Sequence, residues 1–156
     1  MSPILDTAAQ FFKEDEWPFT QLEGKPILRT GFSGRNGQWN CFAQAREDQY
    51  RFIFYSVCPS NVPEPRRQAM AEFLTRANYG LIIGNFELDY SDGEVRYKTS
   101  IDVEGDELTA ALIKQMVYAN VLTFDKYLPG VMKVMYTEGL PLDAVNEIEN
   151  PPPATS

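Results

Sequence analysis

The strongest constraint on the fold is the stretch from residue 84 to residue 105, where two β-like segments flank a tight-turn signal. Asp92-Gly93 favours a two-residue type I′ turn, because that turn needs positive φ at both central positions. A loop of only these two residues would pair Tyr90 with Val95, Asp89 with Arg96, Leu88 with Tyr97, Glu87 with Lys98 and Phe86 with Thr99. The apolar side chains then share one face and the charged pairs share the other. The sequence therefore predicts an antiparallel hairpin with one buried and one wet face.

A second signal of the same kind, Asn36-Gly37, lies between two further β-like segments. It would pair Phe32 with Cys41, Thr30 with Ala43 and Leu28 with Ala45. Short strands are expected at residues 19–23 and 27–33. The run from Tyr50 to Val57 is apolar on both sides, which is typical of a strand covered on both faces. In a chain of this size, the second cover could come from another subunit.

Helical patterns flank these strands. The first helix is expected to begin at Ser2-Pro3 and run to about Glu16, with Ser2 as a cap. Residues 66–78 have apolar positions at helical spacing. A long helix should follow Asp106 as its N-cap, with Pro129 bending or breaking it. Its apolar face is predicted to include Leu108, Leu112, Met116, Ala119 and Leu122.

The resulting fold class is α+β, with the order αβββαββα and a five-stranded antiparallel sheet packed against helices. A chain of 156 residues is long enough for one domain with its own core. We therefore expect a single domain over residues 1–149, which includes one more short helix near its end. Residues 150–156 are predicted to be a disordered tail.

Charge and composition narrow the function classes. The chain has 14 basic and 22 acidic residues, a net charge of −8, which repels the nucleic-acid phosphate backbone. We therefore expect no nucleic-acid partner. No apolar run approaches the ~20 residues of a membrane span and no secretory leader is evident, so we expect a cytoplasmic protein with no membrane contact.

Residues that carry chemistry are sparse. The chain has no histidine, the commonest general base and metal ligand. Cys41 and Cys58 are interpreted as ordinary buried thiols, although a disulfide between them stays open. Asp92 lies in a fragment with the wrong spacing for a calcium loop, and turn formation explains it better. We predict no catalytic residue, no metal site and no cofactor.

Three motifs carry a family resemblance: Arg76-Ala-Asn-Tyr-Gly80, Gly84-Asn-Phe-Glu-Leu-Asp89 and Asp92-Gly-Glu-Val-Arg96. With the helix from Leu108 and the stretch from Gly139 to Glu149, they resemble the YbjN-like family of small bacterial proteins. That family is labelled a sensory transduction regulator and shares the fold of class I type III secretion chaperones, which are dimers that hold an extended partner segment. The resemblance implies a non-enzymatic, protein-binding role and supplies no catalytic residues to transfer.

The leading hypothesis is thus a protein-binding or regulatory module that acts through a hydrophobic surface as a homodimer. Aromatic residues are favoured at interface centres. The candidate interface consists of Tyr50, Phe52, Phe54, Tyr55, Met70, Phe73 and Leu74. One alternative is an enzyme or small-ligand-binding protein with a pocket lined by Trp17, Trp39, Tyr50 and Tyr55. Another is a purely structural subunit of a larger assembly.

Overall fold

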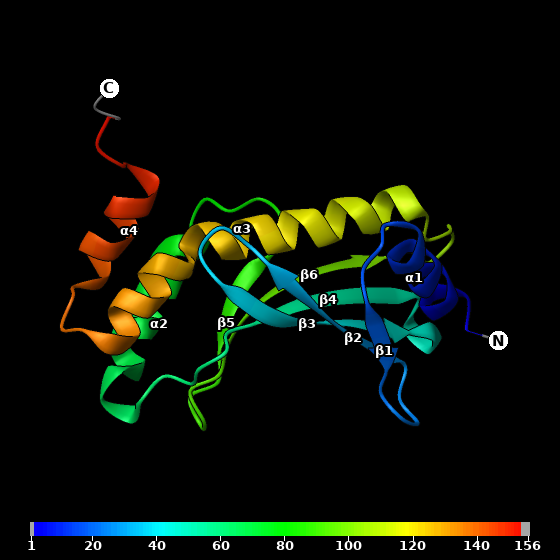
Figure 1. Cartoon of the computed structure of the whole chain (residues 1–156), viewed down its shortest axis with the longest axis horizontal. Coiled ribbons are helices and arrows are strands. Elements are labelled where there is room, and N and C mark those ends of the chain that lie inside the picture. Colours follow the sequence, from blue (N-terminus) through cyan, green and yellow to red (C-terminus); the bar gives the residue numbers. More distant parts are fainter. Residues whose placement is uncertain (1, 154–156) are drawn as a thin grey trace.

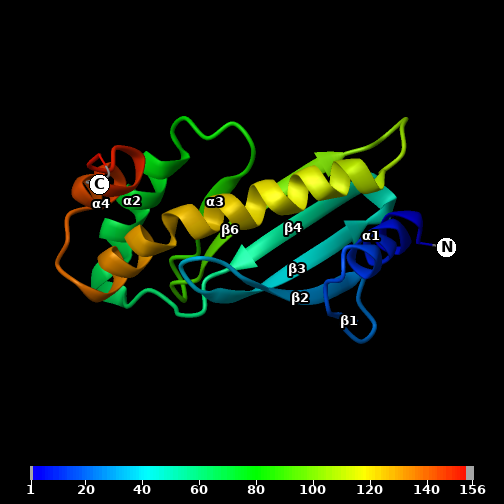
Figure 2. The ribbon, with the colours of Figure 1, turned by 45° about the horizontal axis from the view of Figure 1, so that its top comes forward.

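The protein is a twisted antiparallel sheet with helices on one of its faces (Figures 1 and 2). The computed structural model describes residues 2–153. The six strands, in the spatial order β1-β2-β3-β4-β6-β5, are β1 (Phe19–Gln21), β2 (Ile27–Ser33), β3 (Gln38–Arg46), β4 (Arg51–Val57), β5 (Asn85–Leu88) and β6 (Val95–Asp102). The helices are α1 (Pro3–Glu14), α2 (Arg67–Asn78), α3 (Ala110–Tyr136) and α4 (Pro141–Glu149), with short 3-10 turns at Glu47–Gln49 and Glu64–Arg66.

The predicted α+β class is confirmed, with a different strand count. The sheet has six strands rather than five: every β-like segment noted in the sequence forms a strand, including the three-residue β1, which pairs with β2 at the edge. The expected short helix near the C-terminus is α4. Of the predicted tail, residues 150–153 lie beyond α4 without helix or strand, and residues 154–156 lie outside the described part of the chain.

Both predicted hairpins form, but their register differs from the prediction. In each hairpin, a residue of the first strand pairs with a residue two positions earlier in the second strand than predicted. Leu88 pairs with Val95 and Glu87 with Arg96, so the loop between β5 and β6 has six residues rather than two. Tyr90, expected on the buried face, lies in that loop and is 56% exposed. Side chains alternate between the two faces of a strand, so a register shift of two residues does not change the face on which they lie. The remaining side chains of both hairpins therefore lie on their predicted faces.

Long-range contacts explain the displacement. In the β2–β3 hairpin, which pairs Thr30 with Cys41, the Asp125 carboxylate accepts the backbone N–H groups of Arg35 and Asn36 at 2.9 and 2.8 Å. These two residues therefore form the loop. In the β5–β6 loop, Gly93 has φ +82° and its carbonyl accepts the Val62 N–H at 2.8 Å. Neither partner is close in sequence to the turn that it fixes.

The N-terminal caps of α1 and α3 differ from the predicted ones. Ser2 makes no side-chain cap to α1; instead the Glu47 carboxylate accepts the N–H groups of Ile4 and Leu5, each at 3.0 Å. The N-cap of α3 is Thr109 rather than Asp106, and its hydroxyl accepts the Leu112 N–H.

Helix α3 is continuous through Pro129, and Figure 1 shows its axis bending over the last third. Its predicted apolar face is only partly correct: Leu108 is buried, and Leu112 and Met116 pack against the core. Leu122 is 58% exposed, and the buried row is Ile113, Val117, Asn120, Val121, Phe124, Tyr127, Leu128, Val131, Val134 and Met135.

Helices α1 and α3 cover one face of the sheet, while α2 and α4 pack around the C-terminal half of α3 (Figure 2). At the centre of the covered face lies Asn120, a fully buried amide. Its Nδ2 donates to the carbonyls of Phe54 and Tyr97 at 2.9 and 3.1 Å, and its Oδ1 accepts from Ser56 at 2.6 Å. These bonds connect α3 to β4 and β6, two neighbouring strands beneath it.

Substitution of Gly93 tests the β5–β6 loop. An added Cβ would lie 2.2 Å from the Val62 carbonyl oxygen, on top of the cost of positive φ. We expect Gly93→Ala to lower the free energy of unfolding by about 3 kcal/mol in urea titration. The matched control is Gly105→Ala, where φ is +79° but an added Cβ would meet no atom within 4 Å. We expect this variant to lose about 1 kcal/mol of unfolding free energy. Equal losses would contradict the close packing on Val62.

Candidate protein-interaction surfaces

The structure buries most of the predicted interface residues in this chain's own core. Tyr50 is 51% exposed at the start of β4, and Tyr55 is half-buried on the uncovered face of the sheet. The other five are at most 3% exposed: Phe52, Phe54, Met70, Phe73 and Leu74. Phe52 and Phe54 face the helices, and the three α2 residues pack into the same core. In this conformation those five side chains offer no surface to a partner.

The uncovered sheet face carries an apolar centre on its inner strands. Phe42 on β3 lies directly opposite Tyr55 on β4, and Ile53 and Val57 continue the same side of β4. Ile53 is only 8% exposed although no helix covers it, because neighbouring side chains on the face shield it. The guanidinium of Arg96 lies over the Tyr55 ring, 4.3 Å from its centroid. This arrangement differs from the fully covered strand that the sequence predicted.

The same face holds the charged residues of the strands. Glu87 accepts from Arg96 at 2.8 Å and from Lys98 at 3.0 Å, and Arg51 pairs with Asp102 at 3.1 Å. Partial burial favours the neutral form of Glu87, but the hydrogen bonds from Lys98 and Arg96 outweigh it and lower the pKa of that carboxyl. Two more arginines, Arg29 and Arg46, are exposed on this face.

A second surface is the loop between α2 and β5, which presents large apolar side chains to solvent. Tyr79 is 91% exposed, Ile82 is 92% exposed and Ile83 is 47% exposed. The loop runs beside α3 in both views of the ribbon (Figures 1 and 2). Exposed apolar clusters of this kind mark interaction sites more often than scattered single residues do.

Hydrogen bonds fix this loop at both ends. The Asn78 side chain bonds both the N–H and the carbonyl of Phe86, at 2.7 and 3.1 Å. The Tyr97 hydroxyl donates to the Ile83 carbonyl at 2.5 Å. The backbone of Gly84 lies against β6, where a Cβ would meet the Lys98 carbonyl at 2.6 Å. The loop is therefore held in place while its apolar side chains point outward.

Sequence reasoning missed this surface. The run Leu81-Ile82-Ile83 between two glycines is apolar, and such a run normally indicates a buried segment. Its exposure follows from the positions of Asn78 and Gly84, which no local pattern reveals.

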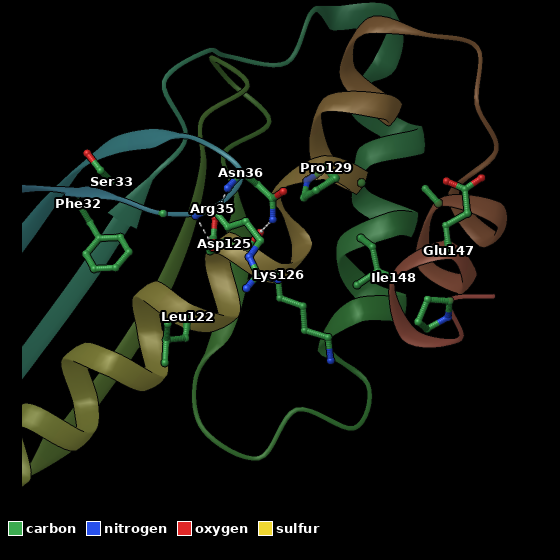
Figure 3. A pocket seen from close by; sticks show the side chains of 14 residues that line it. Phe32, Ser33, Arg35, Asn36, Leu122, Asp125, Lys126, Pro129, Glu147 and Ile148 are labelled. Carbon is green, nitrogen blue, oxygen red and sulfur yellow. Dashed lines mark hydrogen bonds between the residues drawn. The ribbon is translucent and has the colours of Figure 1, made fainter. Parts of the chain in front are cut away.

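A groove of about 900 Å³ lies between the β2–β3 turn, α3 and α4 (Figure 3). Both of its lining carboxylates are bound within the protein. Asp125 holds the Arg35 and Asn36 N–H groups, and Glu147 pairs with Lys133. Lys126 has its amine 5.6 Å from the centroid of the Tyr127 ring. With its carboxylates engaged, the charged groups left in the described lining are the cations of Arg35 and Lys126, too few to define a ligand site.

Within residues 2–153, no three potential metal ligands of the Cys, Asp or Glu type lie close enough together to hold an ion. None of the helices described is both long and apolar enough to cross a bilayer.

Comparison of the structure with solved structures supports the fold. The crystal structure of YbjN from E. coli, described as a putative transcription regulator, superposes with a TM-score of 0.63 at 15% identity, over 86% of this chain and 91% of that one. The HopA1-SchA chaperone–effector complex contains a chain that matches with a TM-score of 0.50 at 16% identity, over 81% of this chain and 94% of that one. These likenesses show a shared fold.

Comparison of the sequence gives the family. No curated protein matches significantly. The family model for YbjN, described as "Putative bacterial sensory transduction regulator", matches residues 5–132 and so spans most of the chain. The expected resemblance is confirmed: this chain belongs to the YbjN family.

Proposed function

We propose that the protein is a non-enzymatic protein-binding or regulatory module that acts as a homodimer through an apolar surface. The observation that carries the proposal is the apolar loop, residues 79–83, whose side chains Tyr79, Ile82 and Ile83 are exposed while its ends are fixed. The fold shared with a chain of a chaperone–effector complex is consistent with this role. A pre-ordered apolar surface loses little conformational entropy on association, which favours binding.

The homodimer is assigned to the apolar loop rather than to the uncovered sheet face. A two-fold dimer brings the same patch of both copies together. On the sheet face this would bring together two patches that each carry five basic and two acidic residues, and like charges placed against each other cost several kcal/mol. The loop from Tyr79 to Gly84 contains no charged residue, so two copies can meet there without repulsion.

The alternative of an enzyme or ligand pocket lined by Trp17, Trp39, Tyr50 and Tyr55 has less support. Both tryptophans are at most 8% exposed, and their indole N–H groups donate within the protein, to Asp15 and Ser56. Tyr50 and Tyr55 line separate hollows. The four residues therefore do not surround a common cavity.

Light scattering after gel filtration tests the dimer. We expect a mass about twice the chain mass of 17.7 kDa at micromolar concentration. Ile82→Ser should shift the mass to that of the monomer, because it removes the most exposed apolar side chain of the loop. The control is Leu142→Ser, which changes a residue that is 47% exposed on α4. A wild-type monomer, or dissociation by the control alone, would refute the assignment.

Thiol reactivity tests the non-enzymatic proposal at Cys41. Burial raises the pKa of the Cys41 thiol to about 12, which outweighs its contacts with Ser56 and Trp39. We expect neither Cys41 nor Cys58 to react with a disulfide reagent at pH 8 in the folded protein, and both to react in guanidinium. Since the folded pKa is the higher one, stability from the protonated thiol should be lost as pH rises from about 9 towards 12. Rapid labelling of native Cys41 would point to a nucleophile.

A further inference from the structure

We propose that the uncovered sheet face binds an acidic, extended segment of a partner protein. This inference rests on the proposed function and names the class of partner and the surface that receives it. The apolar loop at residues 79–83 is assigned to the homodimer, which leaves the sheet face free in each copy.

Charge provides the first argument. All seven charged residues of the six strands lie on the uncovered face: Arg29, Arg46, Arg51, Glu87, Arg96, Lys98 and Asp102. Five are basic and two are acidic, whereas the rest of the chain has nine basic and 20 acidic residues. A cationic sheet on an acidic protein attracts an anionic segment and favours its approach to this side.

Unpaired cations provide the second argument. Arg29 and Arg46 have no carboxylate within 4.0 Å among residues 2–153, although both are exposed on this face. Arg96 and Lys98 share the single carboxylate of Glu87. The face therefore has positive charge left over for a partner's carboxylates.

The order of side chains across the strands provides the third argument. One row runs Arg29, Phe42, Tyr55, Lys98 on β2, β3, β4 and β6, so two aromatic rings lie between two cations. With strands about 4.8 Å apart, the row spans about 14 Å. In an extended chain, residues i and i+4 are about 13 Å apart. A segment with acidic residues at i and i+4 and an apolar residue at i+2 fits this row.

A hollow beside the row can seat the apolar residues. It has a volume of about 380 Å³, and Ile53, Tyr55 and Ile101 contribute its apolar lining. The charged residues around it are Arg46, Arg51, Lys98 and Asp102, so cations outnumber the single carboxylate, which Arg51 already binds. Apolar contact at the centre with charge pairs at the rim is the usual arrangement of a protein interface.

Two other occupants fit less well. Single-stranded nucleic acid needs free aromatic faces for base stacking, but the Arg96 guanidinium already covers the Tyr55 ring. A second copy of this chain placed symmetrically would set cation against cation. Both are distinguished from an acidic segment by the experiment below.

The test uses the full chain and a fluorescein-labelled 13-residue peptide, (Glu-Ser-Leu-Ser)₃-Glu, followed by fluorescence anisotropy at low salt. We expect saturable binding in the micromolar range, at least tenfold tighter than for the same peptide with Lys in place of Glu. Arg29→Gln combined with Arg46→Gln should weaken binding at least tenfold. The matched control is Lys13→Gln with Lys114→Gln, which removes the same charge from exposed positions on α1 and α3 and should change affinity less than twofold.

Any one of the following outcomes would overturn the inference. No saturable binding below 1 mM, or equal binding of the Lys peptide, removes the acidic segment as occupant. Equal weakening by both double variants removes the site. Tighter binding of a 12-nucleotide oligothymidylate favours nucleic acid, and a change of mass in the Arg29/Arg46 variant favours a second copy. Failure of the proposed dimer is read separately, from the mass of the wild type and of Ile82→Ser.

Discussion

The buried amide of Asn120 fixes how the long helix lies on the sheet. Its Nδ2 reaches the carbonyls of Phe54 and Tyr97, and its Oδ1 receives the Ser56 hydroxyl, which in turn accepts the Trp39 indole N–H at 2.9 Å. Apolar packing alone would tolerate a helix shifted by one turn. A shifted helix would leave these polar groups buried without partners, which costs about 1–3 kcal/mol for each group. The network therefore selects one placement of α3, and with it which face of the sheet is covered.

Much of the fold was predictable because faces depend on alternation alone. The side chains of the β5–β6 hairpin keep their predicted sides even though the loop is four residues longer than expected. Register was not predictable, because Asp125 and Val62 decide it from distant parts of the chain. The cap of α1 by Glu47 has the same character. Local sequence signals cannot include contacts across about 30 to 90 residues.

The apolar face of α3 was mispredicted for a related reason. The helix packs on the sheet through its first half and on α2 and α4 through its second half, so apolar residues surround much of it. Its periodicity is therefore weak, and the exposed Leu122 looked like a core residue. The opposite difference occurs in β4: of the aromatic residues placed in the candidate interface, Phe52 and Phe54 lie in the core, whereas Tyr50 is exposed and Tyr55 is half-buried. Exposure, unlike periodicity, depends on the whole fold.

The two proposed surfaces differ in chemistry and lie on different parts of the molecule. The loop at residues 79–83 is uncharged and lies beside α3, on the helical side of the sheet, whereas the cationic row lies on the opposite face. An uncharged patch suits self-association and a charged patch suits a partner of opposite sign. Occupation of one surface therefore leaves the other accessible.

The unbroken course of α3 through Pro129 has a mechanical consequence. A helix of 27 residues is about 40 Å long, and it forms part of both the sheet layer and the cluster with α2 and α4. Gly130 lets Phe73 and Ile148 approach the helix backbone closely, so the far cluster is also tightly packed. Neither half can melt without pulling turns of the same helix away from the other. The chain should thus behave as one cooperative unit, with no internal boundary at which a protease or a pulling force could separate it into stable parts.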